Sequence, residues 1–461
     1  PEPILIESLA DYRTQFGEGC HRTFRIAPAI AGGDFSAPGS VAASYDLIPS
    51  VPGNFNLYDA AQLFFANGGG SCYVASCGDY SATAIDLAAL QAGLAASGTQ
   101  TGPTMVVMPD ACQLGLDDYR TLAAATLAQC AALQDRVAIL DLPGSTDPAN
   151  WSVPATTALA EQFYQAMTGS DGSYSYGTAY HPALRTTLYD TSAVDYTNID
   201  LADPQTATIL AGLLKAEATD AQAAALVARL LSQGGPAPSD PTAVQQFNQA
   251  LVAALSLIGR IEAAILARLN VAPASGAIAG IWAQTDQNRG VWNAPANVGL
   301  ASVLAPAVEL SDADQGPLNA PLNGFAINLV RSFVSRGTVV WGARTLDGNS
   351  NDYRYVPVRR TVVYVEQSIK AALAQYAFAP NDGQTWATVT AAIGNFLTGL
   401  WTEGGLMGDK ASEAFSVRCG LGSTMTGQDI LDGYMLLSVA LQMVHPAEFI
   451  ELTFTQKMQG T

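Results

Sequence analysis

Residues 136–142 read RVAILDL, and this short apolar run decides the fold class of the chain. Four to eight consecutive apolar residues between polar ones are typical of a buried strand. A second run, TMVVM at residues 104–108, predicts another strand. The Ala/Leu-rich stretch 117–133 lies between the two and predicts a helix. Because strand, helix and strand alternate, the sequence predicts an α/β layer with a mainly parallel sheet.

The same alternation continues towards the N-terminus. Strands are predicted at residues 3–7 (PILIE) and 71–76 (SCYVAS), and helices at 57–66 (LYDAAQLFFA) and 84–96. The helix at 57–66 is followed by Asn-Gly-Gly-Gly, and glycine is common just after the last helical residue. Residues 1–190 are therefore predicted to form one α/β domain.

Residues 191–270 have a different character. They are rich in Ala and Leu and contain no strand-like run. From Val244 to Leu269 apolar residues recur at three- and four-residue spacing, which predicts one continuous helix with an apolar stripe. A Gly/Pro break at 234–238 separates this helix from the preceding one. We interpret 191–270 as a helical insertion that is loosely independent of its neighbours.

The last part of the chain returns to mixed structure. Residues 271–322 are predicted to connect the insertion to the core, and 323–461 to form a C-terminal domain. Its strands are predicted at 325–333, 338–341 and 434–444, and its helices at 361–378 and 385–401.

The final strand alternates in character, with Ile450, Leu452 and Phe454 on one face and Glu451, Thr453 and Thr455 on the other. This period-2 pattern spans Phe449 to Lys457 and predicts a strand at the end of the chain. A strand in this place is either the edge of its own sheet or a donor to the sheet of another chain.

Composition excludes several classes of protein. The chain has 461 residues, of which only 13% are charged, and a net charge of −19. Such a charge lacks the basic surface that nucleic-acid binding needs, and an apolar content of 49% excludes disorder. The charge is uneven, because residues 1–322 hold 29 acidic and 11 basic residues, whereas 323–461 hold 11 and 10. This asymmetry suggests two regions with different surroundings, and charges interrupt every apolar stretch before a membrane span is complete.

No catalytic signature accompanies this composition. The three histidines lie in three separate segments, and the sequence contains no G-x-S-x-G elbow and no phosphate-binding G-x-x-x-x-G-K-[ST] motif. The six scattered cysteines are interpreted as small buried hydrophobes in a reducing compartment. Gly32-Gly33-Asp34-Phe35 and Asp347-Gly-Asn-Ser-Asn351 are interpreted as turns. We expect no enzyme, no metal and no cofactor.

A series of short segments resembles the contractile tail sheath proteins of phages, phage-tail-like bacteriocins and extracellular contractile injection systems. In chain order they include ASGAIAG (274–280), TDQNRGVWNAPAN (285–297), RGTVVWGART (336–345), RRT (359–361) and PAEFI (446–450). The resemblance is weaker over 1–190, and 191–270 resembles nothing recognisable. Family members usually have a longer N-terminal arm than a chain beginning at Pro1, which leaves that linkage open.

The resemblance implies that 323–461 is an inner domain near the tube and that 1–190 is an outer or middle domain. It also implies a mechanical function. Sheath subunits stack as six-fold rings around an inner tube and contract to drive the tube through an envelope. They contact baseplate and terminal cap proteins, and a second sheath paralogue sometimes shares the cylinder. Such a subunit assembles in the bacterial cytoplasm, acts in a tail-like particle and neither binds nucleic acid nor inserts into a membrane. The alternatives left open are an α/β enzyme of unknown chemistry and a non-contractile tube or capsid-type protein.

Two groups of residues are candidates for assembly contacts. The first is the intersubunit strand Phe449, Ile450, Glu451, Leu452, Thr453, Phe454 and Thr455. The second is a set of charges that face either the tube or a neighbouring subunit: Arg331, Arg336, Arg344, Arg359, Arg360, Asp409, Lys410, Glu413, Asp429 and Asp432. For the arginines the alternative is ion pairing within their own domain, and for the other charges it is solvated loops.

Overall fold

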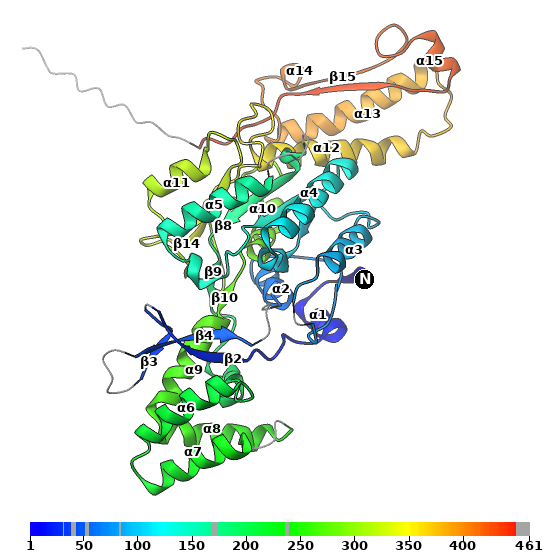
Figure 1. Cartoon of the computed structure of the whole chain (residues 1–461). Coiled ribbons are helices and arrows are strands. Elements are labelled where there is room, and N and C mark those ends of the chain that lie inside the picture. The colour runs from blue at the N-terminus through cyan, green and yellow to red at the C-terminus, as the bar shows by residue number, and fades with distance from the viewer. Residues whose placement is uncertain are drawn as a thin grey trace, which may run out of the picture.

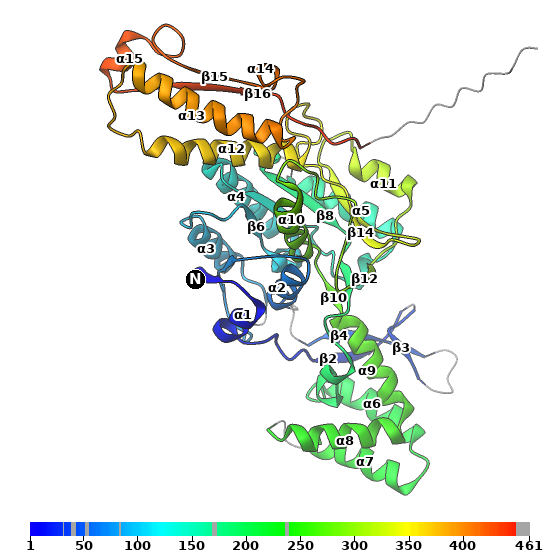
Figure 2. The ribbon, with the colours of Figure 1, turned by 180° about the vertical axis from the view of Figure 1, so that it is seen from behind.

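The computed structural model of the chain describes residues 1–30, 32–37, 43–50, 55–82, 84–167, 173–235 and 239–448. A central sheet domain carries a helical module at one end and a layer of long helices and a β-hairpin at the other (Figure 1, Figure 2). Helices and strands are interleaved along the chain, so the predicted mixed α/β class is confirmed.

A six-stranded sheet forms the centre of the molecule. Its order is β11-β14-β13-β8-β7-β6. The strands are β6 (Met105–Val107), β7 (Val137–Asp141), β8 (Gly177–His181), β11 (Val298–Gly299), β13 (Ile327–Phe333) and β14 (Gly337–Trp341). Neighbours are parallel from β6 to β13 and antiparallel from β13 to β11. The predicted parallel layer is therefore present, with an antiparallel edge added by the C-terminal half.

Both faces of this sheet are covered by helices. On β7, Ala138 and Leu140 pack into the cluster formed with α4 (Leu116–Leu133) and α5 (Val153–Met167). Val137 and Ile139 point to the other face, where α2 (Leu57–Ala66) and α10 (Ser275–Arg289) lie. A strand buried on both faces needs apolar residues at every position, which explains why 136–142 is a continuous apolar run.

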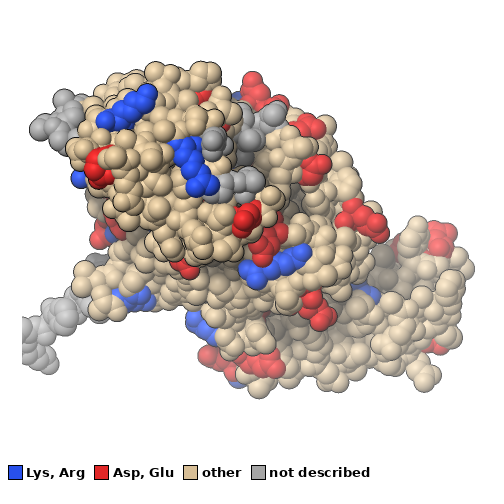
Figure 3. Space-filling view, turned by 90° about the horizontal axis from the view of Figure 1, so that it is seen from below, with Lys and Arg blue, Asp and Glu red and all other residues tan. Residues whose placement is uncertain are grey.

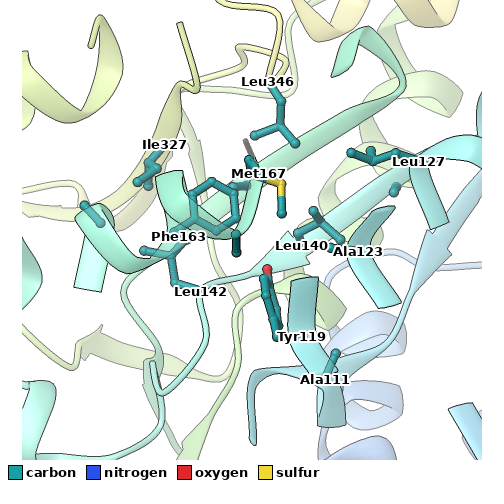
Figure 4. Close-up of a cluster of buried hydrophobic side chains, with 14 of the residues drawn as sticks. Ala111, Tyr119, Ala123, Leu127, Leu140, Leu142, Phe163, Met167, Ile327 and Leu346 are labelled. Carbon is teal, nitrogen blue, oxygen red and sulfur yellow. The ribbon is translucent and has the colours of Figure 1, made fainter. Parts of the chain in front are cut away.

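The central sheet joins the two halves of the chain. Figure 4 shows Ile327 and Leu346, from the C-terminal half, packed with Leu140, Phe163 and Met167 from the N-terminal half. β8 pairs directly with β13, although about 150 residues separate them. The structure therefore differs from the division at residues 190, 270 and 322, because strands on both sides of those positions share one sheet and one core.

Helices α2 and α10 approach each other closely at two glycines. A methyl group on Gly276 would lie 2.6 Å from the backbone oxygen of Ala60, and one on Gly280 would lie 2.5 Å from that of Phe64. Cβ atoms do not approach backbone oxygens so closely, so only glycine permits this spacing. The four-residue interval puts both glycines on one face of α10. The stretch 274–280 is thus a helix-packing surface.

The helical module combines two distant segments. A small sheet in the order β2-β4-β3 packs against helices α6 to α9 in one apolar cluster. Its elements are β2 (Phe24–Pro28), β3 (Phe35–Ser36), β4 (Ser44–Pro49), α6 (Pro204–Glu217), α7 (Ala221–Gln233), α8 (Pro241–Ala254) and α9 (Ser256–Leu269). The insertion is therefore not independent, because strands predicted to belong to the 1–190 domain complete its core.

The predicted continuous helix from Val244 to Leu269 is wrong. The chain bends by 117° between α8 and α9, at Leu255. The carboxylate of Glu217, at the end of α6, accepts hydrogen bonds from the backbone N–H groups of Ser256 (2.7 Å) and Leu257 (3.2 Å). It thereby satisfies donors that a new helix N-terminus leaves unpaired. The apolar stripe runs through the bend because both helices bury one face in the same core.

Replacing Glu217 with alanine is expected to destabilise the helical module by about 1 kcal/mol, the usual cost of losing a helix N-cap. Urea unfolding followed by circular dichroism measures this change. Gln222→Ala, at an exposed position on α7, is the control and should stay within about 0.5 kcal/mol of the native chain. An unchanged midpoint for Glu217→Ala would contradict the capping role.

Asp141 links the end of β7 to the start of α10. It is 6% exposed, and one carboxylate oxygen accepts the backbone N–H of Ser275 at 3.0 Å. Burial raises the pKa of Asp141 to about 6, and its hydrogen bonds to Ser275 only partly oppose this effect. The folded state therefore favours the protonated form, whereas the unfolded chain keeps an ordinary carboxyl pKa near 4.

Stability contributed by Asp141 should be fully present below about pH 4 and lost as the pH rises through about 6. Asp141→Asn, which resembles the protonated acid, should flatten the dependence of unfolding free energy on pH between about 4 and 7. Denaturant unfolding at several pH values measures the slope. Buried Asp110, whose pKa is also raised to about 6, leaves a residual slope of the same sign. Equal slopes for the native chain and the variant would refute the expectation.

Two long helices and a hairpin form the C-terminal layer, called here the hairpin domain. Its elements are α12 (Val356–Ala374), α13 (Gly383–Thr402), α14 (Ala411–Ala414), β15 (Phe415–Cys419), α15 (Gly427–Leu431) and β16 (Leu437–Leu441). The two predicted helices are confirmed, with α12 beginning five residues before the predicted Thr361. The predicted strand 434–444 is shorter in the structure, and its partner β15 had no prediction.

The other elements surround the central domain. They are β1 (Ile4–Ile6), α1 (Leu9–Phe16), β5 (Cys72–Val74), α3 (Leu87–Ser97), β9 (Leu184–Thr186), β10 (Val271–Ala272), β12 (Val303–Pro306) and α11 (Asp312–Asn319). β1 pairs with β5, and β10-β9-β12 form a small antiparallel sheet. Within the described ranges, no single helix has the length and apolarity to cross a bilayer, and only the bent pair α8–α9 passes that test jointly.

Candidate functional site

A groove of about 500 Å³ lies between α12 and β16 in the hairpin domain. Val362, Val365 and Ile369 of α12 line one side. Val439 and Leu441 of β16 line the other. Asp352, Glu366 and His445 add polar groups to the lining. The groove is thus lined by apolar and polar side chains together, and it is bordered by a helix and by the edge of a strand.

The strand edge at this groove is unpaired. β15 and β16 form a two-stranded antiparallel sheet, in register from Phe415 opposite Leu441 to Cys419 opposite Leu437. Among the described residues, no further strand joins either edge of this sheet. β15 packs mainly over α13, which leaves β16 beside α12. An extended segment lying about 4.8 Å from β16 would pair with its backbone and cover the apolar face of α12.

The chain leaves the hairpin domain at Glu448, the last described residue. Its carboxylate accepts hydrogen bonds from Arg344 Nη2 (2.6 Å), Asn319 Nδ2 (2.6 Å) and Tyr355 Oη (3.0 Å). Arg344 Nε lies 2.9 and 3.0 Å from the two carboxylate oxygens. These hydrogen bonds lower the pKa of Glu448, although burial opposes the shift. One acidic side chain thus contacts the end of α11, the segment after β14 and the start of α12.

Four of the five predicted arginines are buried inside the chain. Arg331, Arg344, Arg359 and Arg360 are each less than 9% exposed. Arg331 pairs with Asp312, Arg344 with Glu448 and Arg360 with Asp286. Arg359 stacks on Tyr176 and Tyr353 and donates to Ser175. The structure thus supports contacts within the chain rather than tube contact for these four residues, as ion pairs for three of them and as ring stacking and a hydrogen bond for Arg359, because a buried guanidinium needs its partners.

The other predicted charges lie apart from one another. Arg336 donates to the side chain of Asn297 and lies over the ring of Trp341. Asp409, Lys410 and Glu413 surround α14, before the start of β15. Asp429 and Asp432 lie at α15, beyond the far end of β15, where Asp429 caps the helix by accepting from Thr426. The tube-facing role of these charges stays a prediction.

The predicted intersubunit strand Phe449–Thr455 lies outside the described residues. The sequence interpretation did not single out Glu448, Tyr355 or Asn319, nor the groove beside β16. One signal was available: Glu448 stands in PAEFI, which was quoted for its resemblance and not for its chemistry. An isolated acid in an apolar stretch is a candidate for a buried ion pair.

The surface of the described chain shows no concentrated charge on the face seen from the helical module. Figure 3 shows Lys and Arg scattered singly between Asp and Glu, with large uncharged areas between them. Among the described residues, no three His, Cys, Asp or Glu side chains are grouped to hold a metal ion. The groove and the free strand edge therefore remain the features best suited to binding another chain.

Comparisons with known proteins point to one family. A family model described as the phage tail sheath protein central domain matches residues 233–346, and one described as the phage tail sheath C-terminal domain matches 349–457. The tail sheath protein of Burkholderia phage BcepMu is 29% identical over 144 residues, 30% of each chain. That of Vibrio phage KVP40 is 29% identical over 137 residues, 29% of this chain and 20% of the relative. These matches span less than a third of the curated relatives.

Solved structures match over nearly the full length. The PVC sheath complex, an extracellular contractile injection system in its contracted state, is 26% identical with a TM-score of 0.57, covering 99% of this chain and 87% of that one. The contracted helical sheath of the anti-feeding prophage is 27% identical with a TM-score of 0.56, covering 99% and 88%. Two adjoining family models and these full-length matches lead to one conclusion: the chain belongs to the contractile tail sheath protein family.

Proposed function

We propose that this protein is the structural and mechanical subunit of a contractile sheath, polymerising as stacked six-fold rings around an inner tube. Support comes from the family and from the likeness to two sheaths solved in contracted states. No nucleotide is consumed in this scheme. The work comes from the free-energy difference between two packings of the same chain.

The observation that carries the proposal is the free edge of β16 beside the groove, where Val362, Val365 and Ile369 of α12 are within reach of a paired strand. We propose that the groove receives the alternating segment Phe449–Lys457 of a neighbouring subunit. Ile450, Leu452 and Phe454 would face α12, and the polar residues between them would face outward. Backbone hydrogen bonds tie subunits together without demanding side-chain fit, so such a link survives rotation of one subunit against another.

We propose that the strand in the groove comes from a neighbouring subunit and not from the same chain, because of the direction in which the chain leaves the hairpin domain. After β16 it runs from Leu441 to Glu448, which is held by Asn319 and Arg344 of the central domain. Figures 1 and 2 both show this stretch passing from the hairpin towards α11, away from the tip of the hairpin. A return to the same groove would require the segment to reverse its direction at once.

We further propose that the subunit meets an inner tube protein, baseplate proteins and a terminal cap. The anti-feeding prophage baseplate, which matches with 29% identity and a TM-score of 0.54, supports a baseplate contact. Assembly in the bacterial cytoplasm follows from the resemblance and belongs to the same proposal. The enzyme alternative is not favoured, because the family is structural. The tube or capsid alternative lacks the sheath-type segments.

Negative-stain electron microscopy of the purified, polymerised chain tests this function. Striated cylinders in two states, one long and narrow and one short and wide, are the expected result when tube and baseplate are co-expressed. Cylinders of a single diameter under all conditions would favour a non-contractile tube. Isolated globules at every concentration would refute the proposal.

A further inference from the structure

We infer that Glu448 is a positioning residue that anchors the terminal segment (449–461) to the central sheet, so that tension on this segment bypasses β16. The inference rests on the proposed function, in which the terminal segment links neighbouring subunits. It concerns the path that force takes inside one subunit.

The carboxylate of Glu448 is surrounded by several hydrogen-bond donors. Glu448 receives hydrogen bonds from three side chains that belong to separate elements, and its Arg344 contact involves two nitrogens. Arg344 is 5% exposed, so this charge-assisted pair is largely screened from water. The guanidinium of Arg344 also lies over the ring of Tyr355, with its Cζ atom 5.8 Å from the centre of that ring. The carboxylate is thus fixed in one position and direction.

Arg344 is itself secured to the middle of the central sheet. Its backbone N–H donates to the side chain of Asn328 on β13 at 2.7 Å. Its carbonyl oxygen accepts from Thr178 Oγ1 on β8 at 2.7 Å and from Asn328 Nδ2 at 2.8 Å. Asn328 and Thr178 are both fully buried. A pull on Glu448 therefore reaches β8 and β13, two parallel neighbours in the six-stranded core.

Without this anchor the load would fall on the hairpin. β16 directly precedes the exit, and its last residue, Leu441, pairs with Phe415. Just beyond it, the backbone of Gln442 is hydrogen-bonded to Ala414 and Met407. A pull on the exit would open these contacts first and then the pairs of β16 in order, one after another. Opening in sequence needs far less force than breaking all the pairs together. The anchor at Glu448 removes this weakness and preserves the free edge of β16, which the next subunit needs.

The anchor also fixes where the terminal segment starts. A segment held at one point and in one direction loses less conformational freedom when it binds a neighbour, which strengthens the contact without new interactions. Releasing Glu448 should therefore weaken assembly while leaving the subunit folded. This distinguishes positioning from a purely structural role.

Glu448→Gln tests the inference in the full-length chain, because it keeps the size of the side chain and removes its charge. Asp286→Asn is the matched control, since Asp286 forms the same two-pronged contact with buried Arg360, away from the exit. We expect similar losses of melting temperature in the free subunits. Only Glu448→Gln should raise the critical concentration for polymerisation, by about tenfold or more. Equal critical concentrations for both variants would overturn the inference.

A second variant and a second measurement guard against misfolding of Glu448→Gln. Tyr355→Phe removes one donor and keeps the ring, and we expect a smaller rise in critical concentration in the same direction. Hydrogen exchange should show β16 amides exchanging at least about tenfold faster in assembled Glu448→Gln cylinders than in native cylinders. Equal protection of β16 in the two kinds of cylinder would also overturn the anchor.

Different experimental results would refute the proposed function and the anchoring role of Glu448. If the native chain forms no cylinders, the proposed function fails and the anchor with it. If native cylinders form and Glu448→Gln cylinders match them in critical concentration and β16 protection, only the anchor is wrong.

Discussion

Replacing Gly280 with alanine is expected to destabilise the subunit by at least about 3 kcal/mol, which is at the upper end of the costs measured for overpacked cores. The added methyl group would lie 2.5 Å from the carbonyl oxygen of Phe64 and 2.8 Å from the Cβ of Asn67. A backbone oxygen in a helix cannot turn aside as a flexible side chain can. α2 and α10 would therefore have to separate along the whole of their contact.

Urea unfolding of the purified subunit, followed by tryptophan fluorescence, measures this loss, because Trp282 is fully buried on α10. The matched control is Gly212→Ala on α6, where an added methyl group meets nothing within 4 Å. That control should stabilise the chain by up to about 1 kcal/mol, since alanine favours helix over glycine. If both substitutions stabilise, the close approach of α2 and α10 is not what holds this face of the sheet.

Deleting residues 449–461 is expected to abolish long cylinders while leaving the subunit folded. Because the proposed strand pairs with a neighbouring subunit and not with its own, we expect the melting temperature of the free subunit to change little. Polymerisation should fail at concentrations where the full chain forms cylinders, because the free edge of β16 then has no donor strand. Normal cylinders from the deleted chain would refute strand donation.

The alternation of the terminal segment provides a sharper version of this experiment. Leu452→Asn places a polar group on the apolar face and should weaken polymerisation strongly. Thr453→Asn, one residue later, changes only the opposite face and serves as the control. Electron microscopy and sedimentation compare the two at equal subunit concentration. Equal effects would show that the segment does not bind as a strand with one buried face.

The sequence predicted elements whose signal is local. The amphipathic helix at 57–66 and its glycine stop correspond to α2 residue for residue. The bend at Leu255 was missed for a physical reason. The apolar spacing does not change there, and the group that caps α9 is Glu217, a residue on another helix.

The division into domains was missed because strand pairing is not local. The run 325–333 shows that β13 exists, yet nothing within it identifies β8 as its partner. The interpretation of the uneven charge on either side of residue 322 is wrong for a similar reason. Arg331 and Arg360 of the last third neutralise Asp312 and Asp286 of the first two thirds, so counting charges along the chain does not separate two surfaces.

The pairing of β8 with β13 also sets the order in which the subunit can be made. β8 leaves the ribosome long before β13, and a long gap normally makes closing a loop slow and entropically costly. Helices α6 to α9 lie inside that gap, and the chain on either side of them is held together where β9 pairs with β10. Once this pairing has formed, the stretch between β9 and β10 no longer lengthens the loop that has to close. Glu448 follows β8 and β13 in the chain, so the linking segment is anchored only after the strands that bear its load have been made.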